Sequence, residues 1–203
     1  PPTVTAATGI DAMVHAIEAY TSVRLKNPLS DMLAREALRL MASNISTAVK
    51  QGDNLQAREA MLLGAMLAGQ AFANAPVAAV HALAYPLGGN YHIPHGLSNS
   101  LVLPHVLRFN APAAAELYAE LAPIILPGTT LPNDPLDISE LLAEHFSQLA
   151  ADLGLQTKLS EMNIAKSDLP KLAEEAMLQQ RLLINNPREL CLDDALSIYQ
   201  QAF

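Results

Sequence analysis

The stretch that decides the fold is Thr8-Gly9-Ile10-Asp11-Ala12-Met13-Val14-His15-Ala16-Ile17-Glu18-Ala19-Tyr20. Its apolar residues recur every three or four positions, which is the spacing of one face of a helix. Thr8 can cap free N–H groups and Asp11 would lie in the first turn, so we expect the helix to begin at Thr8. Asp11 and His15 are four residues apart. Their side chains therefore project from one face, one turn apart, and can reach a single cation.

The same spacing recurs along the rest of the chain and predicts an all-α fold. The expected helices cover residues 28–52, 54–73, 77–87, 97–104, 111–125, 136–153, 167–181 and 193–202. Pro86 with Gly88-Gly89 should break the helix over 77–87, and Pro104 should kink or end the helix that starts at Leu97. Loops are expected over 90–96 and 126–135. The small residues of 54–73 allow close helix contacts and predict a central position for that helix.

No segment alternates polar and apolar residues as a strand does, and no fixed-period repeat occurs, so we expect one helical domain over residues 1–203. Apolar residues make up 51 % of the 203 and charged residues 16 %, a balance typical of a folded chain. So few charged residues cannot cover the whole surface, which predicts that some apolar surface is covered by another molecule or domain. The net charge of −8 argues against nucleic acid as a partner. No apolar run is long enough to span a membrane.

The single cysteine, Cys191, excludes an internal disulfide framework and a cysteine-based zinc site. It is expected to be a small packing residue in a reducing compartment, which with no secretory signal in view predicts a cytoplasmic location. The nine glycines form neither G-x-G-x-x-G nor G-x-x-x-x-G-K-[ST]. The chain therefore has no recognisable phosphate-binding loop.

Four side chains could form a metal site. His81 lies on a later predicted helix and His95 follows a turn fourteen residues on, so with Asp11 and His15 they offer three imidazoles and one carboxylate. This set suits Fe²⁺ or Zn²⁺ and is too rich in nitrogen for Ca²⁺ or Mg²⁺. Spacing alone leaves another interpretation open, in which Asp11 is a capping acid and the histidines are core residues.

The residues around these positions resemble two signatures of the iron-containing (group III) alcohol dehydrogenases. Residues 8–20 resemble the first. Residues 80–89 (Val-His-Ala-Leu-Ala-Tyr-Pro-Leu-Gly-Gly) with 93–99 (Ile-Pro-His-Gly-Leu-Ser-Asn) resemble the second. Residues 103–110 (Leu-Pro-His-Val-Leu-Arg-Phe-Asn) and 185–188 (Asn-Asn-Pro-Arg) also match habits of that family. The likeness covers nearly the whole chain in order.

The resemblance implies an enzyme of two domains, an N-terminal α/β domain that binds NAD(P) and a helical C-terminal domain that holds the metal. Residues 1–203 would be the helical metal- and substrate-binding domain, and the N-terminal domain would be absent from this chain. The reaction would be hydride transfer between an alcohol and NAD(P)⁺, with the metal polarising the substrate oxygen. The implied partners are a small alcohol or aldehyde, the N-terminal nucleotide-binding domain and a second copy of the protein. The chain alone would be inactive.

The resemblance also places Asp11, His15, His81 and His95 at the four metal-ligand positions, with Fe²⁺ as the metal and Zn²⁺ as the alternative. Many members carry a second histidine four residues after the third ligand, and here that place is Tyr85. A phenol, with an ordinary pKa of about 10, is no ready proton shuttle at pH 7, which leaves Tyr85 as a pocket wall or hydrogen-bond donor. His92 is a candidate pocket residue or an exposed loop histidine.

The remaining histidines are expected to be structural, His105 before a continuing helix and His145 on the surface or half-buried. Two other functions are alternatives to the enzyme. A di-iron carboxylate bundle would need paired Glu-x-x-His motifs, and none occurs. A metal-free helical interaction or regulatory domain would explain the apolar surface, and metal analysis of the purified chain distinguishes it from the enzyme.

Overall fold

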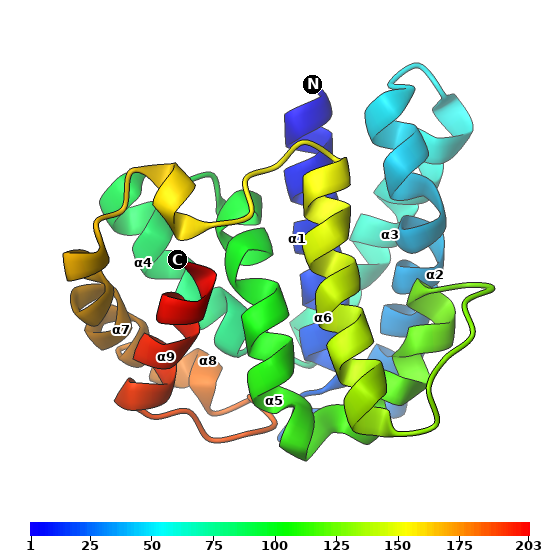
Figure 1. Ribbon diagram of the computed structural model, residues 1–203. Coiled ribbons are helices and arrows are strands. Elements are labelled where there is room, and N and C mark those ends of the chain that lie inside the picture. The colour runs from blue at the N-terminus through cyan, green and yellow to red at the C-terminus, as the bar shows by residue number, and fades with distance from the viewer.

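The computed structural model describes all residues, 1–203, as nine α-helices and two short 3₁₀-helices with no strand (Figure 1). The predicted all-α fold is confirmed. A single hydrophobic core of 59 buried residues runs through the bundle. The α-helices are α1 (Pro2–Tyr20), α2 (Pro28–Lys50), α3 (Leu55–Asn74), α4 (Ala79–Tyr91), α5 (His95–Ile125), α6 (Pro135–Asp152), α7 (Leu169–Met177), α8 (Gln180–Leu183) and α9 (Leu192–Ala202). The 3₁₀-helices are η1 (Leu159–Met162) and η2 (Lys166–Asp168).

Helix α1 is the central element, because it packs against α2, α3 and α5 and buries twelve of its residues. It begins at Pro2 and not at Thr8 as predicted. Pro2 fits the first turn because the missing N–H would have no partner there. The Thr8 hydroxyl donates to the carbonyl of Val4, one turn earlier. Asp11 is therefore in the middle of the helix, where its carboxylate is free for contacts with other helices.

Helix α3 lies at the edge of the bundle, so its predicted central position is wrong. Its small residues do permit a close approach on one face: a Cβ on Gly64 would lie 2.6 Å from Cγ of Met41 in α2. The opposite face is apolar and exposed, with Leu55 at 72 % and Leu62 at 75 % of their full accessibility. Small residues thus bring α3 against α2 without surrounding it.

Prolines do not end α4 or α5, so the predicted break at Pro86 is wrong, and of the two outcomes expected at Pro104, a kink or an end, the helix end does not occur. Pro86 lies inside α4, and the helix continues past Gly88-Gly89 to Tyr91. Helix α5 contains Pro104, as well as Pro112 and Pro123, and changes direction along its length (Figure 1). A proline removes one backbone hydrogen bond, but the buried neighbours of Pro86, Leu83 and Leu87, keep that segment of α4 helical through packing.

The loop predicted over 90–96 is consequently reduced to residues 92–94, and His95 is the first residue of α5. The C-terminal part agrees more closely with expectation, except that residues 167–181 divide into η2, α7 and the start of α8. Tyr199 of α9 donates its hydroxyl to the carbonyl of Leu83, 2.6 Å away. This bond ties the last helix to the middle of α4.

The N-terminal turn of α5 lies directly on α1 at Gly96. A Cβ at this position would lie 2.7 Å from the carbonyl carbon of Ala7 and closer still to its oxygen. These are backbone atoms, which cannot move aside as the end of a side chain can. Only glycine therefore lets α5 approach α1 this closely. The preceding residue, His95, consequently lies next to α1.

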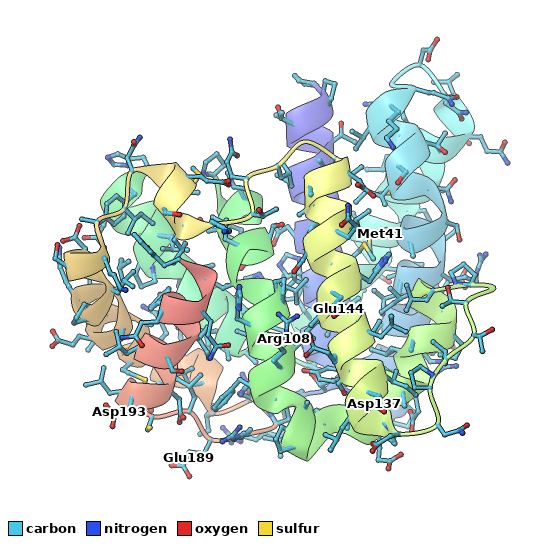
Figure 2. The ribbon with its side chains drawn as sticks, in the orientation of Figure 1. Met41, Arg108, Asp137, Glu144, Glu189 and Asp193 are labelled. Carbon is cyan, nitrogen blue, oxygen red and sulfur yellow. The ribbon has the colours of Figure 1, made fainter.

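Arg108 links α5 to α6, which carries Asp137 and Glu144 on the same side of the molecule (Figure 2). Its guanidinium donates to both oxygens of Glu140, from Nη2 at 2.6 Å and from Nε at 2.9 Å. His105 lies one turn before Arg108. Burial and the nearby positive charge of Arg108 lower the pKa of His105 to about 4. The predicted structural role of His105 is consistent with this buried, neutral position.

No single helix is long and apolar enough to cross a membrane. By length and composition, α3 and α4 pass only as a pair, bent by 107°.

We predict that Gly96→Ala destabilises the protein by about 2–3 kcal/mol, because the added methyl group must push two backbones apart. The free energy of unfolding in urea measures the change. Gly69→Ala is the matched control, since nothing lies within 4 Å of a Cβ at Gly69 and alanine is the better helix former. Equal stability of Gly96→Ala and the wild type would contradict the close contact.

We also predict that His105 makes the fold sensitive to acid. Between about pH 6.5 and 4, His105 binds a proton in the unfolded chain but stays neutral in the folded protein. The free energy of unfolding therefore falls as the pH falls through this window. A gap of this size corresponds to about 3 kcal/mol. The free energy of unfolding in urea is measured at pH 7, 6, 5 and 4. Between pH 7 and 4 it should fall by about 3 kcal/mol less in His105→Gln than in the wild type. Parallel curves for variant and wild type would refute it.

Candidate metal centre

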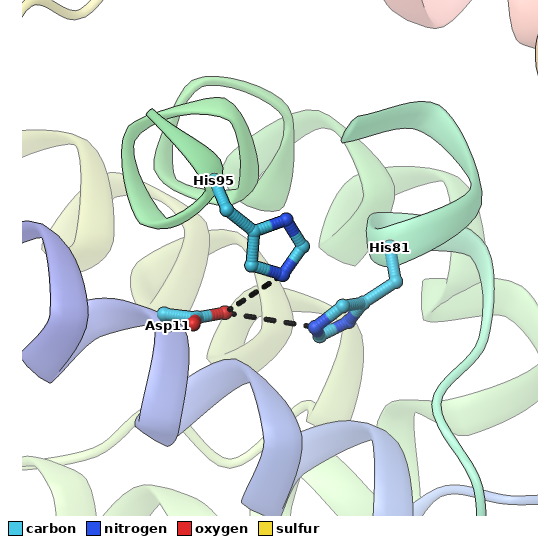
Figure 3. A group of neighbouring side chains, drawn as sticks. All are labelled: Asp11, His81 and His95. Carbon is cyan, nitrogen blue, oxygen red and sulfur yellow. Dashed lines mark ion pairs between the residues drawn. The ribbon is translucent and has the colours of Figure 1, made fainter. Parts of the chain in front are cut away.

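Three helices bring the candidate ligands together. Asp11 projects from α1, His81 from the first turn of α4, and His95 from the first residue of α5 (Figure 3). Oδ1 of Asp11 is 3.6 Å from Nε2 of His81 and 3.7 Å from Nε2 of His95. One ligand atom from each residue lies within 4.8 Å of the other two. Residues far apart in sequence thus direct one oxygen and two nitrogens at a common point.

His15 lies beside this group on α1. Its Nε2 is 3.1 Å from Nε2 of His81, and its Nδ1 is 3.9 Å from Oδ1 of Asp11. The ring stacks on Phe72 of α3, with centroids 4.6 Å apart and planes inclined by 21°. Phe72 therefore packs against the imidazole of His15. All four residues singled out from the sequence are thus neighbours, but only Asp11, His81 and His95 bring ligand atoms within 4.8 Å of one another, and His15 lies beside them.

The spacing of these atoms is suited to a small cation. Donors at 2.0–2.1 Å around a tetrahedral ion lie about 3.4 Å apart. The distances of 3.1, 3.6 and 3.7 Å lie on both sides of that value. Three imidazoles with one carboxylate also match the donors that Fe²⁺ and Zn²⁺ accept. The residues present therefore fit a divalent transition metal.

A buried amide marks the same point. Nδ2 of Asn99, on α5, lies 2.6 Å from Oδ1 of Asp11, 3.2 Å from Nε2 of His95 and 3.3 Å from Nε2 of His81. One amide group thus meets an acceptor atom from each of the three residues. Its own Oδ1 is buried without any hydrogen-bond partner. The side chain occupies a position where three sets of lone pairs converge, as they would on a cation.

Behind His81, the ring nitrogen Nδ1 lies 2.6 Å from Oε2 of Glu18. Glu18 is on α1 and is only 4 % exposed. His81 is therefore enclosed between two carboxylates, Glu18 at Nδ1 and Asp11 on the side of Nε2. Buried charges are rare in an apolar bundle unless they are paired, and here each carboxylate faces an imidazole.

The pKa values reflect this mixture of burial and charge. Burial opposes the charged form of His81, but the charge of Glu18, its hydrogen bond to Nδ1 and the nearby carboxylate of Asp11 outweigh it and raise the pKa of His81 to about 9. Burial lowers the pKa of His15. Burial would raise the pKa of Asp11, yet the neighbouring imidazoles of His81, His15 and His95 leave it lowered. Asp11 is thus held as a carboxylate, ready to face a positive charge.

The two candidate pocket residues lie in different places. The ring of Tyr85, one turn after His81 on α4, has its centroid 5.9 Å from that of His95. This position beside a candidate ligand suits a pocket wall. His92 is exposed in the link between α4 and α5, in the left-handed conformation at φ 55°, with no hydrogen bond or ring contact to the ligand group. Its backbone N–H donates to Gly88 and closes α4, so its observed role is that of a helix cap.

His145 and Cys191, both predicted to have structural roles, differ in how they lie in the fold. His145 is half-buried against Phe146, as predicted, with ring centroids 5.5 Å apart. Cys191 is exposed, so its predicted packing role is wrong. It is the N-cap residue of α9, and its backbone N–H donates to the carboxylate of Asp194. Backbone geometry at a helix start, and not the size of the side chain, fixes its position.

Glu18 and Asn99 are not among the site residues predicted from the sequence, although the sequence contains a signal for each. Glu18 follows Asp11 by seven residues and His15 by three, so all three share one face of α1. Asn99 follows His95 by four and shares its face of α5. A charged residue in a long apolar helix is a reason to look for a partner. Nothing in the sequence indicated that Phe72 would lie against His15.

Comparisons with known proteins point in one direction. Residues 5–203 match the profile of the Fe-containing alcohol dehydrogenase family, C-terminal part. The chain is 43 % identical to long-chain-alcohol dehydrogenase 1 of Geobacillus thermodenitrificans and 41 % identical to 1,3-propanediol dehydrogenase of Klebsiella pneumoniae. Both alignments cover 100 % of this chain and 51 % or 52 % of the relative.

Solved structures agree. A 1,3-propanediol oxidoreductase superposes with a TM-score of 0.94 at 41 % identity, and an alcohol dehydrogenase from Oenococcus oeni with a TM-score of 0.93 at 39 %. Each match covers 100 % of this chain and 52 % of the other. The chain spans about half the length of the relatives it matches. With its helical architecture and nearly every residue matched, the chain belongs to the Fe-containing alcohol dehydrogenase family and corresponds to its C-terminal part.

Proposed function

We propose that this chain is the metal-holding half of an NAD(P)-dependent alcohol dehydrogenase, which interconverts alcohols with aldehydes or ketones. The observation that carries the proposal is the convergence of Asp11, His81 and His95, with His15 beside them. The family and the names of the relatives support the reaction class. Their names include a lactaldehyde reductase and a sulfoacetaldehyde reductase, so the class is shared while the substrates differ.

Asp11, His15, His81 and His95 would hold the metal, with Fe²⁺ preferred and Zn²⁺ compatible with the same donors. When bound, such an ion supplies Lewis acidity toward an oxygen of the substrate. The chain contributes the environment. His81 is buried and excludes water from one side, while the side chain of His95 is 46 % exposed and leaves the other side open.

Tyr85 and His95 would form the wall along which a small alcohol or aldehyde approaches. The Tyr85 ring lies beside His95 and is half-buried, so it can shape the entrance and orient a substrate by contact or by a hydrogen bond. A tyrosine hydroxyl can donate as well as accept a hydrogen bond. His92, which caps α4 at the surface, has no part in this proposal.

The nicotinamide cofactor would be bound by the N-terminal half of the complete protein. This chain contains no glycine-rich phosphate-binding motif, and its relatives are about twice as long. Hydride transfer requires the nicotinamide to be held close to the substrate carbon. Residues 1–203 would therefore form one domain that provides the metal and part of the substrate pocket, and a cytoplasmic location is in keeping with such an enzyme.

The alternative is a metal-free helical interaction domain. The observation in its favour is the exposed apolar face of α3, including Leu62 and Met66. The two functions make opposite predictions for metal content, so one measurement separates them.

We predict that the chain retains about one Fe²⁺ or Zn²⁺ per molecule after anaerobic loading and desalting, and that His81→Ala retains less than about a tenth of that. The variant loses a buried nitrogen donor that no neighbouring side chain can replace. Elemental analysis by mass spectrometry measures the metal. His145→Ala is the control and should retain the metal, since His145 lies on α6 away from the ligands. A wild-type chain that retains none would favour the interaction domain.

We further predict that the metal-loaded chain alone does not oxidise alcohols with NAD⁺ or NADP⁺, because it contains no glycine-rich phosphate-binding motif to hold the cofactor close to the substrate. Steady-state absorbance of the reduced nicotinamide tests this. Turnover by the isolated chain that disappears in His95→Ala would contradict the prediction. It would show that residues 1–203 bind the cofactor without the N-terminal half.

A further inference from the structure

Glu18 makes two contacts to adjacent residues of α4. Its Oε2 lies 2.6 Å from Nδ1 of His81, and its Oε1 accepts the backbone N–H of Val80 at 2.7 Å. Both contacts are buried, since Glu18 is 4 % and His81 2 % exposed. The two oxygens of one carboxylate are therefore both engaged, and rotation of the carboxylate would break both bonds together.

The contact to Val80 fixes the carboxylate relative to the backbone of α4. Val80 lies in the first turn of that helix, where N–H groups have no partner within the helix. The N-cap residue Ala78 has no side chain that could supply one. Glu18 supplies it from α1 and so holds the start of α4, from which His81 projects.

The contact to His81 fixes which ring nitrogen carries the proton. An ionised carboxylate only accepts hydrogen bonds, so Nδ1 must donate and must carry the hydrogen. Nε2 is then directed away from Glu18, toward Oδ1 of Asp11 at 3.6 Å and Nε2 of His15 at 3.1 Å. This is the nitrogen that a metal in the candidate centre would use.

We infer that Glu18 is a positioning residue of the metal centre, which holds His81 as the Nδ1–H tautomer and presents its Nε2 lone pair to the ion. The inference rests on the proposed function for the identity of the ion. It assigns Glu18 no contact with the metal or the substrate. Carboxylates that hold a ligating histidine in this manner contribute about 10- to 100-fold to metal affinity.

Glu18→Gln is the informative substitution because an amide has one acceptor oxygen and one donor nitrogen. If the amide oxygen stays with Val80, the NH₂ group faces Nδ1 of His81 and favours the tautomer with its proton on Nε2. That proton blocks the lone pair that the ion needs. The expected result is Zn²⁺ affinity weaker by about 10- to 100-fold, measured by competition with a chromophoric chelator. Glu18→Asp, which keeps a carboxylate, should recover part of it.

A matched control separates positioning from general support of α4. Tyr199→Phe removes the hydrogen bond to Leu83, also in α4, and touches no candidate ligand. It should lower the free energy of unfolding of the metal-free chain while leaving the Zn²⁺ affinity within about twofold of wild type. A loss of affinity in Tyr199→Phe equal to that in Glu18→Gln would overturn the inference, and so would wild-type affinity in Glu18→Gln.

The tautomer of His81 is measured without metal, at a pH above the pKa of its imidazole so that the ring is neutral, by long-range ¹H–¹⁵N correlation spectra of the imidazole nitrogens. The wild type should carry the proton on Nδ1, and Glu18→Gln should move it to Nε2. An unchanged tautomer would overturn the inference. If the wild type binds neither Zn²⁺ nor Fe²⁺, the proposed function fails, and the tautomer still decides whether Glu18 positions the ring.

Discussion

The close contact of Gly96 with the backbone of Ala7 is the constraint on which the centre depends. It sets the distance between the first turn of α5 and the middle of α1, two elements that each supply a candidate ligand. A side chain at this position would move His95 away from Asp11, although neither of those residues had changed. The site is therefore as much a property of packing between backbones as of the imidazoles and the carboxylate.

The second requirement is that charge in an apolar interior be balanced. Two carboxylates, Asp11 and Glu18, lie among three imidazoles within a bundle whose other interior residues are largely apolar. Each carboxylate has partners, and the amide of Asn99 donates to Asp11 and faces His81 and His95. Only Oδ1 of Asn99 lacks a partner. Buried polar groups that are almost completely paired keep their geometry, because any displacement leaves a donor or acceptor unsatisfied.

Much of the fold could be predicted from local sequence. Helical spacing placed most helix boundaries within a few residues, and the structure shows side-chain caps at three of the helix starts, Asn27, Asn54 and Asp134. The errors occurred where tertiary packing overrides a local rule. Pro86 and Pro104 lie in helices that continue past them among buried neighbours, and only one face of α3 is buried although small residues occur around the helix.

Less of the candidate centre than of the fold could be predicted from local sequence. Asp11 and His15 share a helix face, so their proximity follows from helix geometry, whereas the arrival of His81 and His95 follows from the packing of three helices. The family resemblance supplied that link. Glu18 and Asn99 lay within the same motifs, but their roles depend on contacts across 62 or more residues of sequence, which spacing cannot reveal.

In this chain the four candidate ligands differ greatly in their exposure, and this gives the candidate centre one open side. The His81 side chain is 2 % exposed and is held from behind, Asp11 and His15 are at 17 % and 19 %, and His95 is at 46 %. An ion held here would be enclosed on the α1–α4 side and bordered by solvent at His95. Exchange of the ion with solution would therefore begin at His95, and its speed would be set by how often that one ring turns away. The same opening is where a dissolved oxidant or a chelator would first meet ferrous iron.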